Sequence, residues 1–192
     1  MKIMVGGIAA GALFGALTSL ANVLSSPFGE IGARVAGTDL AKVSKVLSLL
    51  LDAGWSWAAL AVGVGWAAGS RLRGALSGLL ALVAATVSYY ATDVYLWDAS
   101  TDLIWWLVMG LPLGLILGAV GALTRRPGMT GLIAALIVPA GAAVQMMVLP
   151  VGESFTTPLP AIVAEAIVWT GAALGAVWAL YRFWRERRVD AV

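Results

Sequence analysis

Long apolar runs separated by short polar stretches dominate the sequence. Six of these runs are long enough to cross a bilayer, because a helix rises about 1.5 Å per residue and the hydrocarbon core is roughly 30 Å thick. The pattern predicts an all-α fold, a polytopic bundle of six transmembrane helices that forms one integral membrane domain over residues 1–192. The expected spans are about 3–24, 47–69, 74–93, 104–124, 129–149 and 159–181.

The stretch 25–46 is the longest connection between spans and is expected to form an outer loop. Its last part continues into a run with helical spacing, from Asp39 to Leu51, in which apolar residues such as Leu40 and Val43 alternate with lysines. This pattern is typical of an amphipathic helix that lies along the membrane surface. We expect it either to cap a pocket or to serve only as a lead-in to the second span.

Small residues recur every four positions on two of the expected spans. Such a stripe allows close helix contact in a membrane, where packing rather than hydrophobicity drives helix association. The stripes therefore predict tight crossings, and the same glycine-rich faces are candidates for binding a membrane protein partner or a second copy of the chain. They consist of Gly7, Gly11, Gly15 and Ser19, and of Gly110, Gly114, Gly118 and Ala122.

Basic residues are distributed unevenly between the ends of the expected spans. With the N-terminus inside, only Arg34, Lys42 and Lys45 among the 12 lysines and arginines fall on the outer side. Cytoplasmic loops carry the excess of these residues in membrane proteins. Both termini are therefore expected in the cytoplasm, in a multi-pass protein of the plasma membrane with its acidic loops outside.

The amino-acid composition limits which partners and which kinds of catalysis the protein can have. With 61% hydrophobic residues, 11% charged residues and a mean hydropathy of +0.94, the chain is expected to have the lipid bilayer as its main partner. The net charge of +2 resides at helix ends and does not indicate nucleic acid as a partner. Cysteine and histidine are absent, so we expect no metal and no cofactor. Only carboxylates and tyrosines remain for proton chemistry.

Polar residues near the spans fall on the predicted outer half. Glu165 lies roughly 8 Å inside the last span, where a carboxylate is expected to face the bundle interior, to pair with a donor or to be protonated. Helical spacing also places a carboxylate beside an aromatic ring in three spans, as in the pair Asp52 and Trp55. The candidate site residues are Asn22, Asp52, Trp55, Tyr89, Tyr90, Asp93, Gln145, Glu165 and Trp169.

These acids and rings suit a cationic guest, and we expect an outward-facing pocket for a small cationic or amphiphilic molecule, in transport or sensing. They equally suit a membrane-embedded cyclase or isomerase of prenylated, lipid-like substrates, in which Glu165 or Asp52 is the general acid. A structural or immunity-type membrane partner is a third hypothesis. For single residues, the alternatives are satisfied polar contacts and the aromatic belt of a membrane interface.

The sequence resembles two families. The first, a group of six-span actinobacterial membrane proteins of unknown function, is similar over most of the chain in Leu20-Ala21-Asn22, Ser25-Ser26-Pro27, Asp52-Ala53-Gly54 before Trp55, Tyr89-Tyr90 and the isolated Glu165. The second family is the substrate-binding components of energy-coupling-factor vitamin transporters. The chain is similar to them in size, in its number of spans and in the small pair Ala12 and Ala16 of the first span. That resemblance implies a first helix that docks a coupling subunit and a small-molecule site near the outer face.

Overall fold

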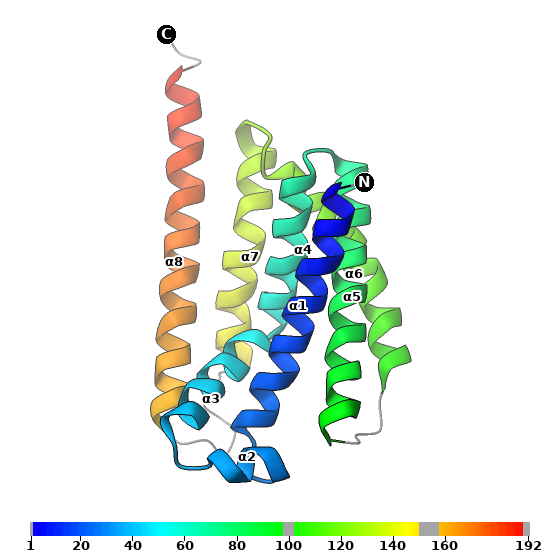
Figure 1. Cartoon of the computed structure of the whole chain (residues 1–192). Coiled ribbons are helices and arrows are strands. Elements are labelled where there is room, and N and C mark those ends of the chain that lie inside the picture. Colours follow the sequence, from blue (N-terminus) through cyan, green and yellow to red (C-terminus); the bar gives the residue numbers. More distant parts are fainter. Residues whose placement is uncertain (1, 98–101, 150–157, 190–192) are drawn as a thin grey trace.

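The computed structural model describes residues 2–97, 102–149 and 158–189, and every regular element among them is an α-helix. Five of these helices, α1, α5, α6, α7 and α8, are long and apolar enough to cross a membrane, and the bent pair of α3 and α4 can form a sixth span (Figure 1). The expected all-α fold is thereby confirmed, with five or six candidate membrane spans. The helices are α1 (Lys2–Ser25), α2 (Glu30–Val35), α3 (Asp39–Leu51), α4 (Gly54–Ala68), α5 (Arg71–Trp97), α6 (Leu103–Leu123), α7 (Gly128–Val148) and α8 (Pro158–Val189).

The bundle has two halves joined through α3 and α4. In one half α5 packs against α1, α4 and α6, and in the other α7 packs against α8. Helix α4 contacts α7, and α3 contacts α8. In Figure 1, α1 begins and α8 ends at the same end of the bundle, which also holds the α4–α5 and α6–α7 turns. We call it the arginine end, because Arg71, Arg73, Arg125 and Arg126 lie at these turns, and we call the opposite end the pocket end.

The predicted glycine stripes make the closest helix crossings. Gly11 and Gly15 of α1 are buried against the backbone of α5. Gly118 of α6 is buried where α6 meets Gly65 of α4 and Gly74 of α5, and a side chain at Gly118 would overlap the backbone of Gly74. The expected close contacts are confirmed. Helices of the same chain cover most of both stripes. Binding of a partner or of a second copy of the chain through these faces stays a prediction.

The span expected over 47–69 is not one continuous helix. The chain forms α3 and α4 instead, with a bend of 66° between them. The backbone leaves the helix at Asp52 and Ala53, and Ala53 is extended with φ −77° and ψ 140°. Apolar periodicity alone did not reveal the break, since the residues on both sides of it are hydrophobic. The outer loop expected over 25–46 is also largely helical, because it contains α2 and the first turns of α3.

Helix α3 confirms the helix expected over Asp39–Leu51, and its buried face carries small polar residues. Ser44 and Ser48 are buried, whereas Leu40 and Val43 are exposed. This distribution is typical of a helix that packs its small polar residues against neighbours and presents apolar residues to a bilayer.

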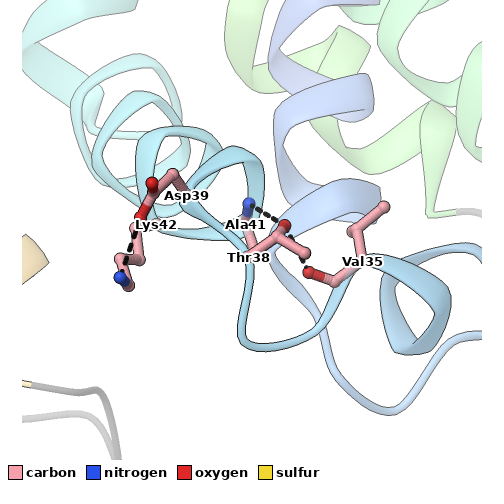
Figure 2. Close-up of polar contacts among 5 residues, drawn as sticks. All are labelled: Val35, Thr38, Asp39, Ala41 and Lys42. Carbon is pink, nitrogen blue, oxygen red and sulfur yellow. Dashed lines mark hydrogen bonds and ion pairs between the residues drawn. The ribbon is translucent and has the colours of Figure 1, made fainter.

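The first turn of α3 is fixed by local polar contacts, which Figure 2 shows. The hydroxyl of Thr38 accepts a hydrogen bond from the Ala41 N–H at 3.4 Å and donates one to the Val35 carbonyl at 2.6 Å. An oxygen in this position satisfies one of the free amides that begin a helix. Lys42 forms an exposed ion pair with Asp39 at 2.8 Å. The sequence thus sets where α3 starts through its cap.

Helix α8 lies at the periphery of the bundle. It has 32 residues and is therefore about 48 Å long, and its C-terminal part extends beyond the other helices at the arginine end (Figure 1). One stripe, including Ala164, Val168 and Ala172, is buried, while most other α8 side chains are exposed. Most of the surface of α8 therefore faces the surroundings of the protein.

Candidate functional site

A cavity of about 570 Å³ lies between α4, α5 and α6 at the pocket end. This volume is within the roughly 300–1,000 Å³ that small-molecule sites occupy. Beyond its deepest residue, Leu117, the three helices meet through Gly65, Gly74 and Gly118 and leave no further space. The lining residues are Asp52, Gly54, Trp57, Ala58, Leu82, Thr86, Tyr89, Tyr90, Trp106, Met109, Gly110, Leu113 and Leu117.

The break between α3 and α4 lies at the mouth of this cavity. Helix α4 has 15 residues and is about 22 Å long, about 8 Å short of the hydrocarbon thickness. Non-helical backbone at that depth is tolerated only where protein or a water-filled cavity surrounds it. The Ser56 hydroxyl is 2.7 Å from the Leu51 carbonyl and 2.6 Å from the Ala53 carbonyl, and donates to these acceptors. The break is thus a supported feature of the fold.

One amide holds the carboxylate at the mouth. Asn22 Nδ2 donates hydrogen bonds to Asp52 Oδ2 and to the Tyr89 hydroxyl oxygen, both at 3.1 Å. Asn22 Oδ1 accepts a hydrogen bond from Ser48 Oγ at 2.6 Å. Through this single side chain α1 is joined to α3, to the break and to α5. The contact fixes the position of Asp52, which is exposed to the open mouth of the pocket.

A row of aromatic rings runs beside Asp52. The ring of Trp57 makes edge-to-face contacts with Phe14 at 5.4 Å and with Tyr89 at 6.1 Å, and Tyr89 contacts Tyr90 at 5.2 Å. Such contacts add about 0.5–1.5 kcal/mol per pair beyond area burial. Trp57, Tyr89 and Tyr90 line the cavity together with Trp106 from α6. The mouth therefore combines one carboxylate with four aromatic side chains.

The structure brings together part of the predicted site. Asp52, Tyr89 and Tyr90 line the cavity, and Asn22 lies directly behind them as their hydrogen-bond partner. Asp93 is one turn beyond Tyr89 on α5, does not line the cavity, and accepts a hydrogen bond from a serine of α1 at 3.4 Å. These five residues form one polar cluster at the pocket end.

Trp55 and Gln145 lie apart from this cluster, which corrects the expectation that they share its pocket. Gln145 Oε1 accepts a hydrogen bond from the Trp55 N–H at 3.0 Å and so caps the first turn of α4. The Trp55 ring packs against the apolar cluster that contains Met146 and Val168, in the other half of the bundle. Because the helix breaks before α4, Trp55 does not continue the face of Asp52 as unbroken helical spacing had suggested.

Glu165 and Trp169 are also placed differently from the prediction. Both side chains are exposed on the outer surface of α8 rather than directed into the bundle. Glu165 has no hydrogen bond or ion pair with any residue that the structure describes. The expectation that Glu165 faces the interior is wrong, because the buried stripe of α8 runs through Ala161, Ala164 and Val168 and turns Glu165 away.

Sequence reasoning missed the residues that form most of the cavity. Trp106, Gly110, Leu113 and Leu117 recur along one face of α6, and Trp57 faces the cavity from α4. Their helical spacing was visible in the sequence. However, α6 is apolar all around, so no polar face indicated which apolar residues turn toward the protein and which toward lipid.

The fold and the site together define a class: a multi-pass helical membrane protein with a broken span that lines a pocket. Comparisons with protein-family models, with curated proteins and with solved structures found no match. The resemblances to two families stay predictions. No group of three or more acidic residues that could hold a metal ion occurs in the described part of the chain.

Proposed function

We propose that the chain is a plasma membrane protein whose pocket faces the exterior and binds a small cationic or amphiphilic molecule, in transport or sensing. The observation that carries this proposal is the break between α3 and α4, two helices apolar enough to form one span, which lines a cavity and bears the carboxylate of Asp52. Discontinuous membrane helices form the substrate sites of many transporters, where the irregular backbone and its polar groups meet the ligand.

The chemistry of the lining favours a cation. Asp52 is the charged residue among the lining residues, and none of them is basic. A cation near Asp52 would also lie beside the rings of Trp57, Tyr89, Tyr90 and Trp106, whose faces attract positive charge. An anionic guest would meet only repulsion from the carboxylate. The remaining lining is apolar, which suits an amphiphilic molecule.

The orientation is supported by the distribution of basic residues. Lys2 and the arginines of the two turns and of the last turns of α8 gather at the arginine end, whereas Arg34, Lys42 and Lys45 belong to α2 and α3 at the other end (Figure 1). The excess of positive charge favours the arginine end in the cytoplasm. The pocket then opens toward the exterior, with both termini inside.

Orientation is testable because the sequence contains no cysteine. A single cysteine placed at an exposed position, Ala36→Cys at the pocket end or Met129→Cys at the arginine end, becomes the sole thiol. A membrane-impermeant maleimide is expected to label Ala36→Cys in intact cells and Met129→Cys only after permeabilisation. The reverse pattern would place the pocket in the cytoplasm and overturn this part of the proposal.

Binding is testable with tetramethylammonium, a cation small enough to enter the mouth, titrated onto the protein in lipid nanodiscs. Asp52→Asn keeps the shape of the side chain and removes its charge. Opposite unit charges about 4 Å apart attract by about 4 kcal/mol at an effective dielectric constant of about 20, so affinity is expected to fall about tenfold or more. Isothermal titration calorimetry gives the dissociation constants directly.

Glu165→Gln is the matched control, because it makes the same chemical change at a carboxylate exposed on α8. It is expected to leave binding unchanged. If both variants bind like the wild type, or if wild-type protein binds no cation, Asp52 does not form a cation site and the proposal fails. If Glu165→Gln alone weakens binding, the site lies on α8 instead.

The rows of aromatic rings also favour a second candidate, an acid-catalysed cyclase or isomerase of prenylated substrates. Trp57, Tyr89 and Trp106 would stabilise a carbocation in the apolar cavity. Asp52 would have to be protonated to act as the acid. Incubation of membranes with polyprenyl substrates would reveal this activity as products of unchanged mass.

A further inference from the structure

The cavity is open along α6 at membrane depth. Among its lining residues, Trp106 is 54% exposed, Met109 is 41% exposed and Leu113 is 52% exposed. Met109 and Leu113 lie about 9 and 15 Å along α6 from its first residue, so they reach the level of lipid chains. In a bilayer, the open side of the cavity therefore meets lipid tails, in addition to the water at its mouth.

The length of the cavity matches one leaflet. From Trp106 to Leu117 the lining follows α6 for 11 residues, or about 16 Å, which is about half of the hydrocarbon thickness. It ends where Gly118 contacts the α5 backbone. The depth of the groove is thus limited by this glycine crossing, which lies about 22 Å along α6 from its first residue, toward the arginine end.

Polar and apolar groups are sorted along this length. The carboxylate of Asp52 and the hydroxyls of Tyr89 and Tyr90 lie at the end that meets the membrane surface. The deeper lining is apolar, with Leu82, Met109, Leu113 and Leu117 among its residues. A molecule that satisfies both parts has a cationic head and an apolar chain about as long as the groove.

We propose that the pocket takes a single-chain amphiphile with a cationic head, which enters sideways from the leaflet along α6. Its head lies at Asp52 between the aromatic rings, and its chain lies between α4, α5 and α6 down to the glycine crossing. This inference rests on the proposed function, which it narrows to a lipid-like substrate supplied by the membrane. A free water-soluble cation would occupy only the mouth.

A substitution at Gly110 tests the apolar groove, which would bind the ligand's hydrocarbon chain, separately from the polar mouth, which would bind its cationic head. Gly110 lines the cavity, and a Cβ at this position would meet no atom within 4 Å. Gly110→Leu therefore fills the groove without displacing backbone. Gly141→Leu on α7 is the matched control, since Gly141 is equally open and does not line the cavity.

The experiment titrates dodecyltrimethylammonium and tetramethylammonium onto each variant in nanodiscs, with the long-chain probe expressed as its mole fraction in lipid. Gly110→Leu is expected to weaken binding of the long-chain probe about tenfold more than binding of tetramethylammonium, because the added side chain occupies the part of the groove that only the long chain would fill. Retained tetramethylammonium binding also shows that the variant is folded. Gly141→Leu is expected to bind both probes like the wild type.

A second measurement locates the chain directly. Dodecyltrimethylammonium with a diazirine at the chain end is irradiated in the bilayer, and the adducts are mapped by mass spectrometry. Adducts concentrated at Leu82, Leu113 and Leu117 are expected. Adducts spread over lipid-facing residues such as Leu174 of α8, together with unchanged long-chain binding in Gly110→Leu, would overturn the inference.

The two proposals fail in different ways. If tetramethylammonium binds in an Asp52-dependent manner while the chain leaves no specific adducts, the cation site stands and only the lipid-like substrate is wrong. If neither probe depends on Asp52, the proposed function fails as well.

Discussion

Helices α4, α5 and α6 behave differently at their two ends. Toward the arginine end they cross so closely that Gly65, Gly74 and Gly118 leave no room for a Cβ atom. Toward the pocket end the same helices present Trp57 and Trp106 to one another and enclose a cavity of about 570 Å³. In lipid no hydrophobic force closes such a gap, because lipid tails are as apolar as the side chains. The three helices therefore pack closely where glycines allow their backbones to touch, and they separate where large side chains such as Trp57 and Trp106 stand between them.

Polar groups follow the same division. The pocket end contains the hydrogen-bonded cluster of Asn22, Ser48, Asp52 and Tyr89, which draws on α1, α3, the break and α5. The arginine end carries exposed charges at its turns, such as Arg125 stacked over Trp66 at 4.6 Å. One end is a rigid crossing that anchors the bundle, and the other is a cavity whose shape depends on side chains. Substitutions at the two ends should therefore have separable effects.

The largest effect is expected from Gly118→Leu. Its side chain would overlap the backbone of Gly74, and backbone atoms of a neighbouring helix cannot move aside independently. We expect α5 and α6 to separate, with a loss of about 3 kcal/mol or more in the free energy of unfolding. Denaturation of the purified protein in mixed micelles measures the change.

Gly63→Leu on α4 is the control for this comparison, since a Cβ at Gly63 meets no atom within 4 Å. It is expected to keep wild-type stability within about 0.5–1 kcal/mol, the difference in helix propensity. Equal stability of the two leucine variants would show that the crossing is not tight.

An intermediate effect is expected from Asn22→Leu. This change leaves Ser48 Oγ without its acceptor and removes the donor shared by Asp52 and Tyr89. Loss of partners for partly buried polar groups costs about 1–3 kcal/mol. We expect a lower melting temperature together with weaker cation binding, because Asp52 is no longer held in place. Normal binding in Asn22→Leu would show that the amide does not position the carboxylate.

The smallest effect is expected from Gln145→Leu. The variant loses the hydrogen bond to the Trp55 N–H, worth about 1 kcal/mol, at the side of α4 that faces away from the cavity. Stability should fall slightly, while the affinity for tetramethylammonium stays at the wild-type value. A loss of affinity as large as that of Asp52→Asn would place Gln145 in the binding site and remove the distinction between the two sides of α4.

Local patterns in the sequence were sufficient for some features. Gly11 and Gly15 indicated a close crossing, and the alternation of apolar residues with lysines after Asp39 indicated a helix, because each signal depends only on spacing within one element. Asn22, Asp52, Tyr89, Tyr90 and Asp93 were among the nine residues predicted for the site, because polar residues in apolar runs need partners. These features needed no knowledge of the neighbouring helix.

Other features depended on contacts between elements. The break at Asp52 turned Trp55 toward α7 and α8 and brought Trp57 to the cavity, although the residues around it read as one apolar span. Glu165 seemed the strongest interior acid by depth, yet the stripe of α8 that includes Ala164 is the one that is buried. The depth of a residue in the membrane follows from its position in the sequence. The direction in which its side chain points depends on which face of the helix packs against the rest of the protein.

The sequence by itself determined that this is an all-α membrane protein, where its apolar helices run, and which few polar residues require partners. Only the tertiary structure decided that α4, α5 and α6 separate to form a cavity and that Asp52 lies at its mouth. The physical reason is that a helix apolar on every face is equally stable against lipid and against protein. Its packing partner is chosen by the shapes of several helices at once, and no single stretch of sequence contains that information.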